Sequence, residues 1–216
     1  MMCLKSFAVV VITLCAVSNA CYALSVKSKT FDQLVLESDE VIQGRVVSIE
    51  SRFGEGSLSH HIFTYIEFNE LKIIDETDNQ VDGSYQLRIV GGRVGNVIQA
   101  FPGLPSFDVG QNYVLFVRGN GHELFPLVGV YQGVYKVVSD DQGDEVIREV
   151  GDHQQILRSV AEYRAAQKQG SIVGRDIATS QRSEESLKAD EFMTLIRQRW
   201  QQLRPHPLFP QSQGNH

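Results

Sequence analysis

The chain has 216 residues, a formal net charge of −6 and a hydrophobic content of 42%. This length and composition fit one globular domain with an appendage, since domains usually have about 100–200 residues. The acidic balance and the lack of a basic stripe argue against nucleic acid as a partner, because phosphate binding uses clustered lysine and arginine.

Residues 1–23 have the pattern of a secretory signal peptide. Lys5 provides a positive start, and residues 6–18 form an apolar run of the length that such signals use. Small residues allow cleavage after Ala23 or after Ala20. No later segment approaches the ~20 apolar residues of a membrane-spanning helix. We therefore expect a secreted or periplasmic protein with no transmembrane segment after cleavage.

The next segment predicts a short helix followed by strands. Thr30 is placed to cap a helix whose apolar face is Phe31, Leu34 and Val35. The apolar period then changes to two. Near Asn69 the phase of the apolar residues reverses, which is typical of a β-bulge.

Short strands at regular spacing make up the central part of the chain. They are predicted over residues 41–52, 60–74, 84–92, 96–100, 113–119, 124–133, 134–140 and 145–150. Such strands, separated by turn residues, predict a mainly β domain over residues 24–151. We expect a small closed or partly open barrel of the OB type.

The carboxyl-terminal part has helical rather than strand periodicity. Amphipathic helices are predicted over residues 152–169 and 184–204, joined by a polar linker over residues 170–183. Residues 205–216 contain three prolines and are expected to be disordered. The apolar stripe around Trp200 either docks on the barrel or binds a partner, and we favour docking.

The glycine-rich stretch at residues 91–95 is not a phosphate-binding loop. It matches neither G-x-x-x-x-G-K-[ST] nor G-x-G-x-x-G, and a strand pattern rather than a helix follows it. We interpret its glycines as sites of positive φ or close backbone approach at a barrel bend. Pro102 and Pro105 would stiffen the loop that follows.

The histidines do not predict a metal site. His60 and His61 are adjacent on a predicted strand and would point to opposite faces, so they cannot both bind one ion without distortion. His122 and Glu123 lack the second histidine of H-E-x-x-H.

The acidic, serine and cysteine residues do not predict a specific site either. The acidic turns at residues 75–83 and 140–144 do not fit the EF-hand pattern, although weak calcium binding remains an alternative. No G-x-S-x-G is present, and the cysteines lie in the signal segment, at Cys3, Cys15 and Cys21. We therefore assign no catalytic, cofactor-binding or metal-binding residue.

Several glycine motifs occur together in this chain. They are a strand with a central glycine, a double glycine, a G-x-P-x-F-x-x-G loop and a G-x-x-Q-G turn, here at residues 41–46, 91–92, 103–110 and 129–133. Over residues 30–140 the chain resembles a family of exported bacterial β-barrel proteins with no assigned activity. More distantly it resembles the OB-type barrel of the netrin and metalloproteinase-inhibitor modules, which implies a binding domain.

The resemblance to the inhibitor modules implies a mechanism of metalloprotease inhibition. Those inhibitors chelate the target's zinc through a disulfide-tethered amino-terminal cysteine, a position that Cys21 would take after cleavage at Ala20. The mature chain has no second cysteine to tether it. A lipid anchor on Cys21 is a further alternative, although Ser18 stands where lipoproteins usually carry Leu, Val or Ile.

These observations favour an exported, non-enzymatic binding domain for a protein or cell-surface partner. One alternative is a cell-envelope hydrolase that uses acidic residues, since the carboxylate pairs of such enzymes need only spatial proximity. The other is an inhibitor of a secreted metalloprotease. No cofactor is expected.

Overall fold

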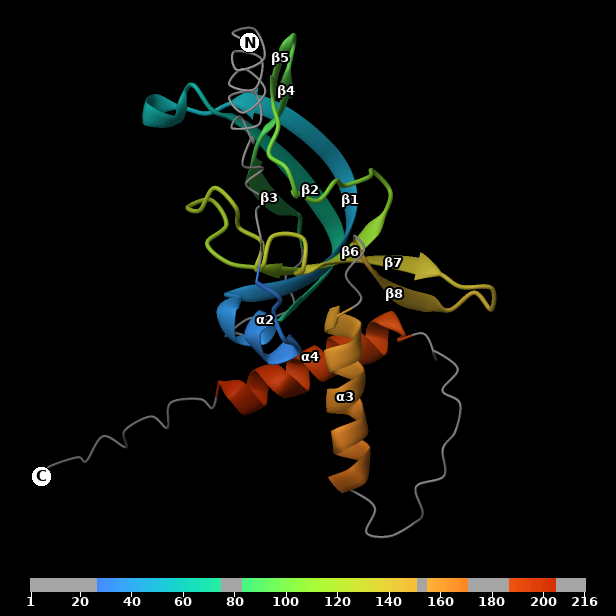
Figure 1. The fold of residues 1–216 in the computed structure, drawn as a ribbon. Helices are drawn as coiled ribbons and strands as arrows, with labels where there is room; N and C mark the ends of the chain where they lie inside the picture. The colour runs from blue at the N-terminus through green and yellow to red at the C-terminus, as the bar shows by residue number, and fades with distance from the viewer. Residues whose placement is uncertain (1–26, 75–82, 151–154, 171–186, 205–216) are drawn as a thin grey trace, which may run out of the picture.

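The computed structural model describes residues 27–74, 83–150, 155–170 and 187–204. Within them, six strands form one antiparallel sheet in the order β3-β2-β1-β6-β7-β8, and β4 and β5 form a separate hairpin (Figure 1). The elements are α2 (Phe31–Glu37), β1 (Glu40–Phe53), β2 (Ile62–Ile74), β3 (Tyr85–Val90), β4 (Gly92–Val94), β5 (Val97–Gln99), β6 (Asn112–Val117), β7 (Val134–Ser139), β8 (Glu145–Glu149), α3 (Gln155–Gly170) and α4 (Ala189–Leu203). The prediction of a mainly β fold with three helices is confirmed.

The six-stranded sheet remains open in the described part of the chain. Its edge strands, β3 and β8, are not paired with each other. The segment after β6 covers the β3 edge, where the Val90 amide donates to the Leu124 carbonyl at 3.0 Å. The β8 edge is covered in the same way, because the Ile147 amide donates to the Leu187 carbonyl at 2.9 Å. The predicted barrel is not confirmed, since loop segments and not a second strand cover the two edges.

Helix α2 begins and packs as its sequence predicts. The Thr30 hydroxyl accepts from the Gln33 amide, and the Gln33 side chain accepts from the Thr30 amide, so two free donors of the first turn are satisfied. Phe31, Leu34 and Val35 are all buried. Their burial places α2 against the sheet.

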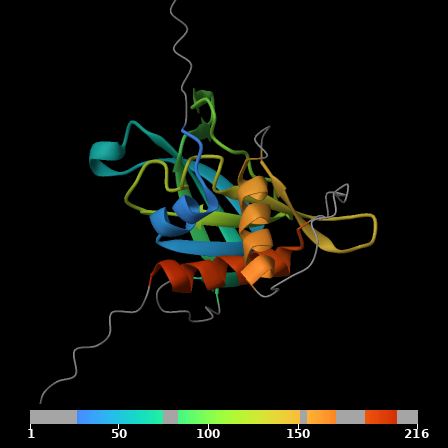
Figure 2. The same cartoon turned by 60° about the horizontal axis from the view of Figure 1, so that its bottom comes forward.

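Helices α3 and α4 complete a helical layer on one side of the sheet (Figures 1 and 2). Phe192, Ile196 and Trp200 of α4 are buried in the first core, which lies between this layer and the sheet. Arg199 of α4 binds the Asp32 carboxylate of α2 through two nitrogens, at 2.7 and 2.5 Å. The docking of the Trp200 stripe on the domain is therefore confirmed.

A second core lies on the other face of the sheet and depends on the predicted bulge. Glu70 and Leu71 of β2 stand opposite Gly44 of β1, and Glu70 has a φ of 53°. The extra residue reverses the phase of β2, so that Phe68 and Ile73 both face this second core. A regular strand would have turned one of them away.

One predicted strand is absent. Residues 124–133 form bends followed by turns over 128–133, and of them Leu127 alone makes a bridge, to Val117. Gly129 and Val130 have φ values of 65° and 62°, which interrupt an extended backbone. The apolar residues that suggested a strand include Leu127 and Val128, which lie in this loop and have their side chains buried in the core.

The termini and linkers bear on several expectations. The signal segment, the acidic stretch at 75–82 and the tail at 205–216 lie outside the described residues. The linker expected over residues 170–183 also lies outside them, except for Gly170, which ends α3. Helix α4 begins at Ala189, later than expected. Helix α3 is described from Gln155, and residues 152–154 of its expected range lie outside the described residues. Among the described helices, none has the length and apolar character needed to cross a membrane.

Candidate binding groove

The double glycine holds the β4–β5 hairpin against the ends of β1 and β2. Gly92 has a φ of 131°, and a Cβ atom there would lie 2.4 Å from the hydroxyl oxygens of both Ser51 and Thr64. The Gly91 amide donates to the Ile62 carbonyl at 2.7 Å, and the Thr64 hydroxyl donates to the Gly91 carbonyl at 2.7 Å. The interpretation of close backbone approach is confirmed. The stretch leads into a hairpin, however, and is not a barrel bend.

The segment that follows the hairpin, residues 100–111, forms a roof loop anchored at its far end. The Gly110 amide donates to the Val46 carbonyl at 2.8 Å, at the β1 bulge. Lys136 lies 2.8 Å from the Asp108 carboxylate, and this hydrogen bond holds the pKa of Asp108 below its usual value. Tyr113 also binds this segment, since its hydroxyl accepts from the Asp108 amide at 3.0 Å.

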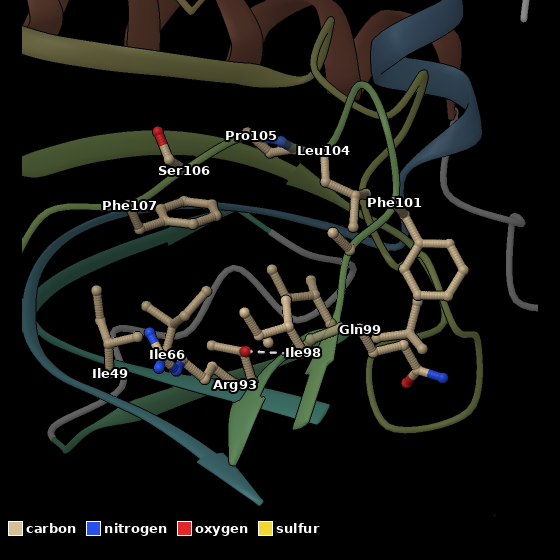
Figure 3. Close-up of a pocket in the computed structure, with 16 residues that line it drawn as sticks. Ile49, Ile66, Arg93, Ile98, Gln99, Phe101, Leu104, Pro105, Ser106 and Phe107 are labelled. Carbon is tan, nitrogen blue, oxygen red and sulfur yellow. Dashed lines mark hydrogen bonds between the residues drawn. The ribbon is translucent and has the colours of Figure 1, made fainter. Parts of the chain in front are cut away.

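A groove of about 350 Å³ lies between the roof loop and the sheet (Figure 3). One wall consists of strand and hairpin residues and the other of the roof loop, and Phe107, Leu104 and Phe101 lie across from Ile49, Ile66 and Ile98 in Figure 3. The full lining is Ile49, Thr64, Ile66, Ile89, Val90, Gly91, Gly92, Arg93, Ile98, Gln99, Ala100, Phe101, Leu104, Pro105, Ser106 and Phe107. We call this site the binding groove.

The binding groove is an opening of the second core to solvent. Ile66 and Ile89 belong both to its lining and to that core, and Phe107 packs against the same core. At the mouth, by contrast, Ile98 is 63% exposed and Ile49 is 36% exposed. Large apolar side chains left in water at a concave site mark a place where a ligand or partner removes them from water.

Arg93 is the one charged residue among the lining residues described. Its Nε donates to the Gly95 carbonyl at 3.1 Å, within the hairpin turn. Figure 3 shows its side chain reaching the Ile49 end of the groove, opposite the end that holds Phe101. The lining has no aspartate or glutamate.

The histidines and acidic residues considered as possible ligands from the sequence are not among the lining residues of this groove. His60 and His61 occupy the turn before β2, and their rings lie 4.4 Å apart, so the expectation that they point to opposite faces of a strand is wrong. The described residues contain no group of three histidine, cysteine or acidic side chains that could hold a metal ion. His122 and Glu123 lie in the loop after β6, where Glu123 pairs with Arg118 at 3.4 Å.

The acidic turn at residues 140–144 serves the β7–β8 hairpin. One carboxylate oxygen of Asp140 accepts from the amides of Gln142 and Asp144, both at 2.9 Å. Asp144 also binds Lys188 at 2.6 Å. These contacts account for Asp140 through turn geometry and for Asp144 through ion pairing.

A partly buried polar cluster joins the starts of β1 and β3. The Tyr85 hydroxyl donates to the Glu40 carboxylate and accepts from the Asn120 side chain at 3.0 Å. Burial raises the pKa of Tyr85 far above its usual value, and the negative charge of Glu40 raises it further. The Asn120 side chain also bonds the backbone of β3 at Gln86 and Arg88. This cluster therefore fixes the loop that covers the β3 edge.

No family model, curated protein or solved structure matched the chain in the comparisons made. The resemblance to exported bacterial β-barrel proteins, and to the inhibitor modules, stays a prediction.

The sequence predicted no functional residue among those that line the binding groove. The available signal was the unusual number of large apolar side chains in a segment rich in glycine and proline, notably Ile98, Phe101, Leu104 and Phe107. Loops usually carry polar residues at the surface, so apolar residues in a loop indicate either a covered core or a binding site.

Proposed function

We propose that this chain is an exported binding domain that acts without catalysis and holds a protein or cell-surface partner through the binding groove. The observation that carries the proposal is the exposed apolar mouth of the groove, at Ile98 and Ile49. Transfer of this surface from water to a partner is favourable in proportion to the apolar area removed.

The groove offers little support for a hydrolase based on acidic residues. Its lining has no carboxylate to act as an acid, base or nucleophile. Several acidic residues described elsewhere take part in ion pairs, namely Asp32 with Arg199, Glu37 with Lys29 and Glu191 with Arg164. Cys21, on which the inhibitor mechanism depends, lies outside the described residues.

The proposal is tested by comparing what three forms of the purified protein capture from an envelope fraction of the producing cells. Ile98→Asp places a charge at the groove mouth without disturbing a buried side chain. Leu36→Asp is the matched control, because Leu36 is 47% exposed on α2, in the helical layer. We expect a component that the wild type and Leu36→Asp retain and that Ile98→Asp loses.

The opposite result is equally clear. If Ile98→Asp captures the same components as the wild type, in the same amounts, the groove is not the site through which the partner is held. Circular dichroism and thermal melting of both variants establish that the fold is unchanged.

A further inference from the structure

The binding groove has two chemically different ends. Its length is apolar, from Phe101 at one end to Ile49 at the other, and the Arg93 side chain reaches the Ile49 end (Figure 3). Within the described part of the chain, Arg93 takes part in no ion pair, and its single hydrogen bond uses Nε and the Gly95 carbonyl. Both terminal nitrogens of the guanidinium therefore remain available to a ligand.

We propose that the binding groove holds a free carboxylic acid with an unbranched apolar chain, of the size of decanoate. The carboxylate lies against Arg93, and the chain runs toward Phe101 between the roof loop and the sheet. This proposal goes beyond the proposed function, because it assigns to the same groove a free small molecule and not a protein or cell-surface partner.

The head group follows from the charge at the groove. A guanidinium presents parallel N–H donors that match the two oxygens of a carboxylate. A cationic head group would be repelled by Arg93, and a neutral one would use fewer of its donors. The whole chain has a net charge of −6, so a free anion is not attracted by the protein's overall charge and depends on this local cation.

The apolar part follows from the size and lining of the groove. A volume of about 350 Å³ is near the lower limit of small-molecule sites, which span about 300–1,000 Å³. The walls are mostly aliphatic and aromatic, and two of the polar side chains among them already form hydrogen bonds with the backbone. Thr64 donates to the Gly91 carbonyl, and Gln99 accepts from the Ile62 amide at 2.7 Å. An apolar chain beside Thr64 and Gln99 therefore breaks neither of these two hydrogen bonds.

Titration calorimetry with decanoate below its micelle concentration tests the proposal, with decan-1-ol as the neutral probe and decyltrimethylammonium as the cationic probe. We expect saturable binding of decanoate, weaker binding of decanol and none of the cation. Affinity should rise about fourfold for each added methylene from hexanoate upward and level off once the chain exceeds the groove. Methyl NMR should show shifts at Ile49, Ile66 and Ile98 but not at Ile147, which lies in the first core.

Two variants separate the head group from the chain. Arg93→Gln should weaken decanoate binding about tenfold and leave decanol binding unchanged. Ile98→Asp should weaken both probes, and Leu36→Asp neither. Equal binding of decanoate and decanol to the wild type, equal effects of Arg93→Gln on the two, or NMR shifts outside the groove would overturn the proposal.

The outcomes also separate this proposal from the proposed function. If decanoate fails to bind while Ile98→Asp still abolishes capture of a partner, the ligand named here is wrong and the binding function stands. If sedimentation shows a dimer that Ile98→Asp dissociates, a second copy of the chain occupies the groove and the fatty-acid proposal fails. If Ile98→Asp affects neither ligand binding nor capture, both proposals are wrong.

Discussion

Gly92→Ala is the most direct test of how the hairpin is held over the sheet. Two costs add at this position. The φ of 131° is rarely adopted by residues other than glycine and costs about 1–3 kcal/mol. The new Cβ would also lie 2.4 Å from the hydroxyl oxygens of Ser51 and Thr64, and overpacking of this kind costs about 1–3 kcal/mol more.

We therefore expect Gly92→Ala to lower the free energy of unfolding by about 2–6 kcal/mol, a large share of the ~5–15 kcal/mol typical of a domain. Urea unfolding followed by far-ultraviolet circular dichroism measures this loss. Gly95→Ala is the matched control, because Gly95 has a φ of 59° and open space around its Cβ position. It should lose the backbone part alone, about 1–2 kcal/mol. Equal losses in the two variants would refute the argument from close approach.

Two further predictions concern the first core and the roof loop. Phe192→Ala should cost about 3–5 kcal/mol in urea unfolding, because Phe192 is fully buried with its ring centroid 5.1 Å from that of Tyr135; a loss below about 1 kcal/mol would contradict the packing of α4. The Asp108–Lys136 contact lowers the pKa of Asp108, so it stabilises the loop above the usual carboxyl pKa of about 3.9 and is lost as pH falls through the lowered value. Amide hydrogen exchange at Gly110 in the wild type should therefore accelerate, relative to the intrinsic exchange rate, as pH falls through the lowered pKa of Asp108. In Asp108→Asn the exchange, corrected for the intrinsic rate, should not depend on pH. Identical pH profiles in the two proteins would refute this role of the Asp108–Lys136 contact.

Local sequence was sufficient for the elements whose causes are local. The capping box at Thr30 and Gln33, the apolar face of α2 and the bulge near Asn69 depend on residues within a few positions of one another. The same holds for the positive φ of the double glycine, since a glycine pair before a short strand is a local signal. These predictions are confirmed because near neighbours set backbone conformation directly.

Alternation alone misled where burial came from elsewhere in the fold. In residues 124–133 the apolar pattern is that of a strand, yet the segment turns repeatedly and Leu127 is buried against strands distant in sequence. The histidine pair was wrong for a related reason. The strand begins at Ile62, so His60 and His61 lie in the preceding turn. Their side chains therefore do not point to alternate faces as they would in a pleated strand.

The openness of the sheet and the existence of the binding groove were decided by tertiary structure. Loop segments cover both edges, and Gly92 meets Ser51 and Thr64 from about 30–40 positions away, so no short window of sequence contains these contacts. The same apolar residues, Phe101, Leu104 and Phe107, would serve equally well in a closed core. They line a groove because the roof loop, fixed to β1 at Gly110, passes over the sheet and the hairpin and leaves a space between them.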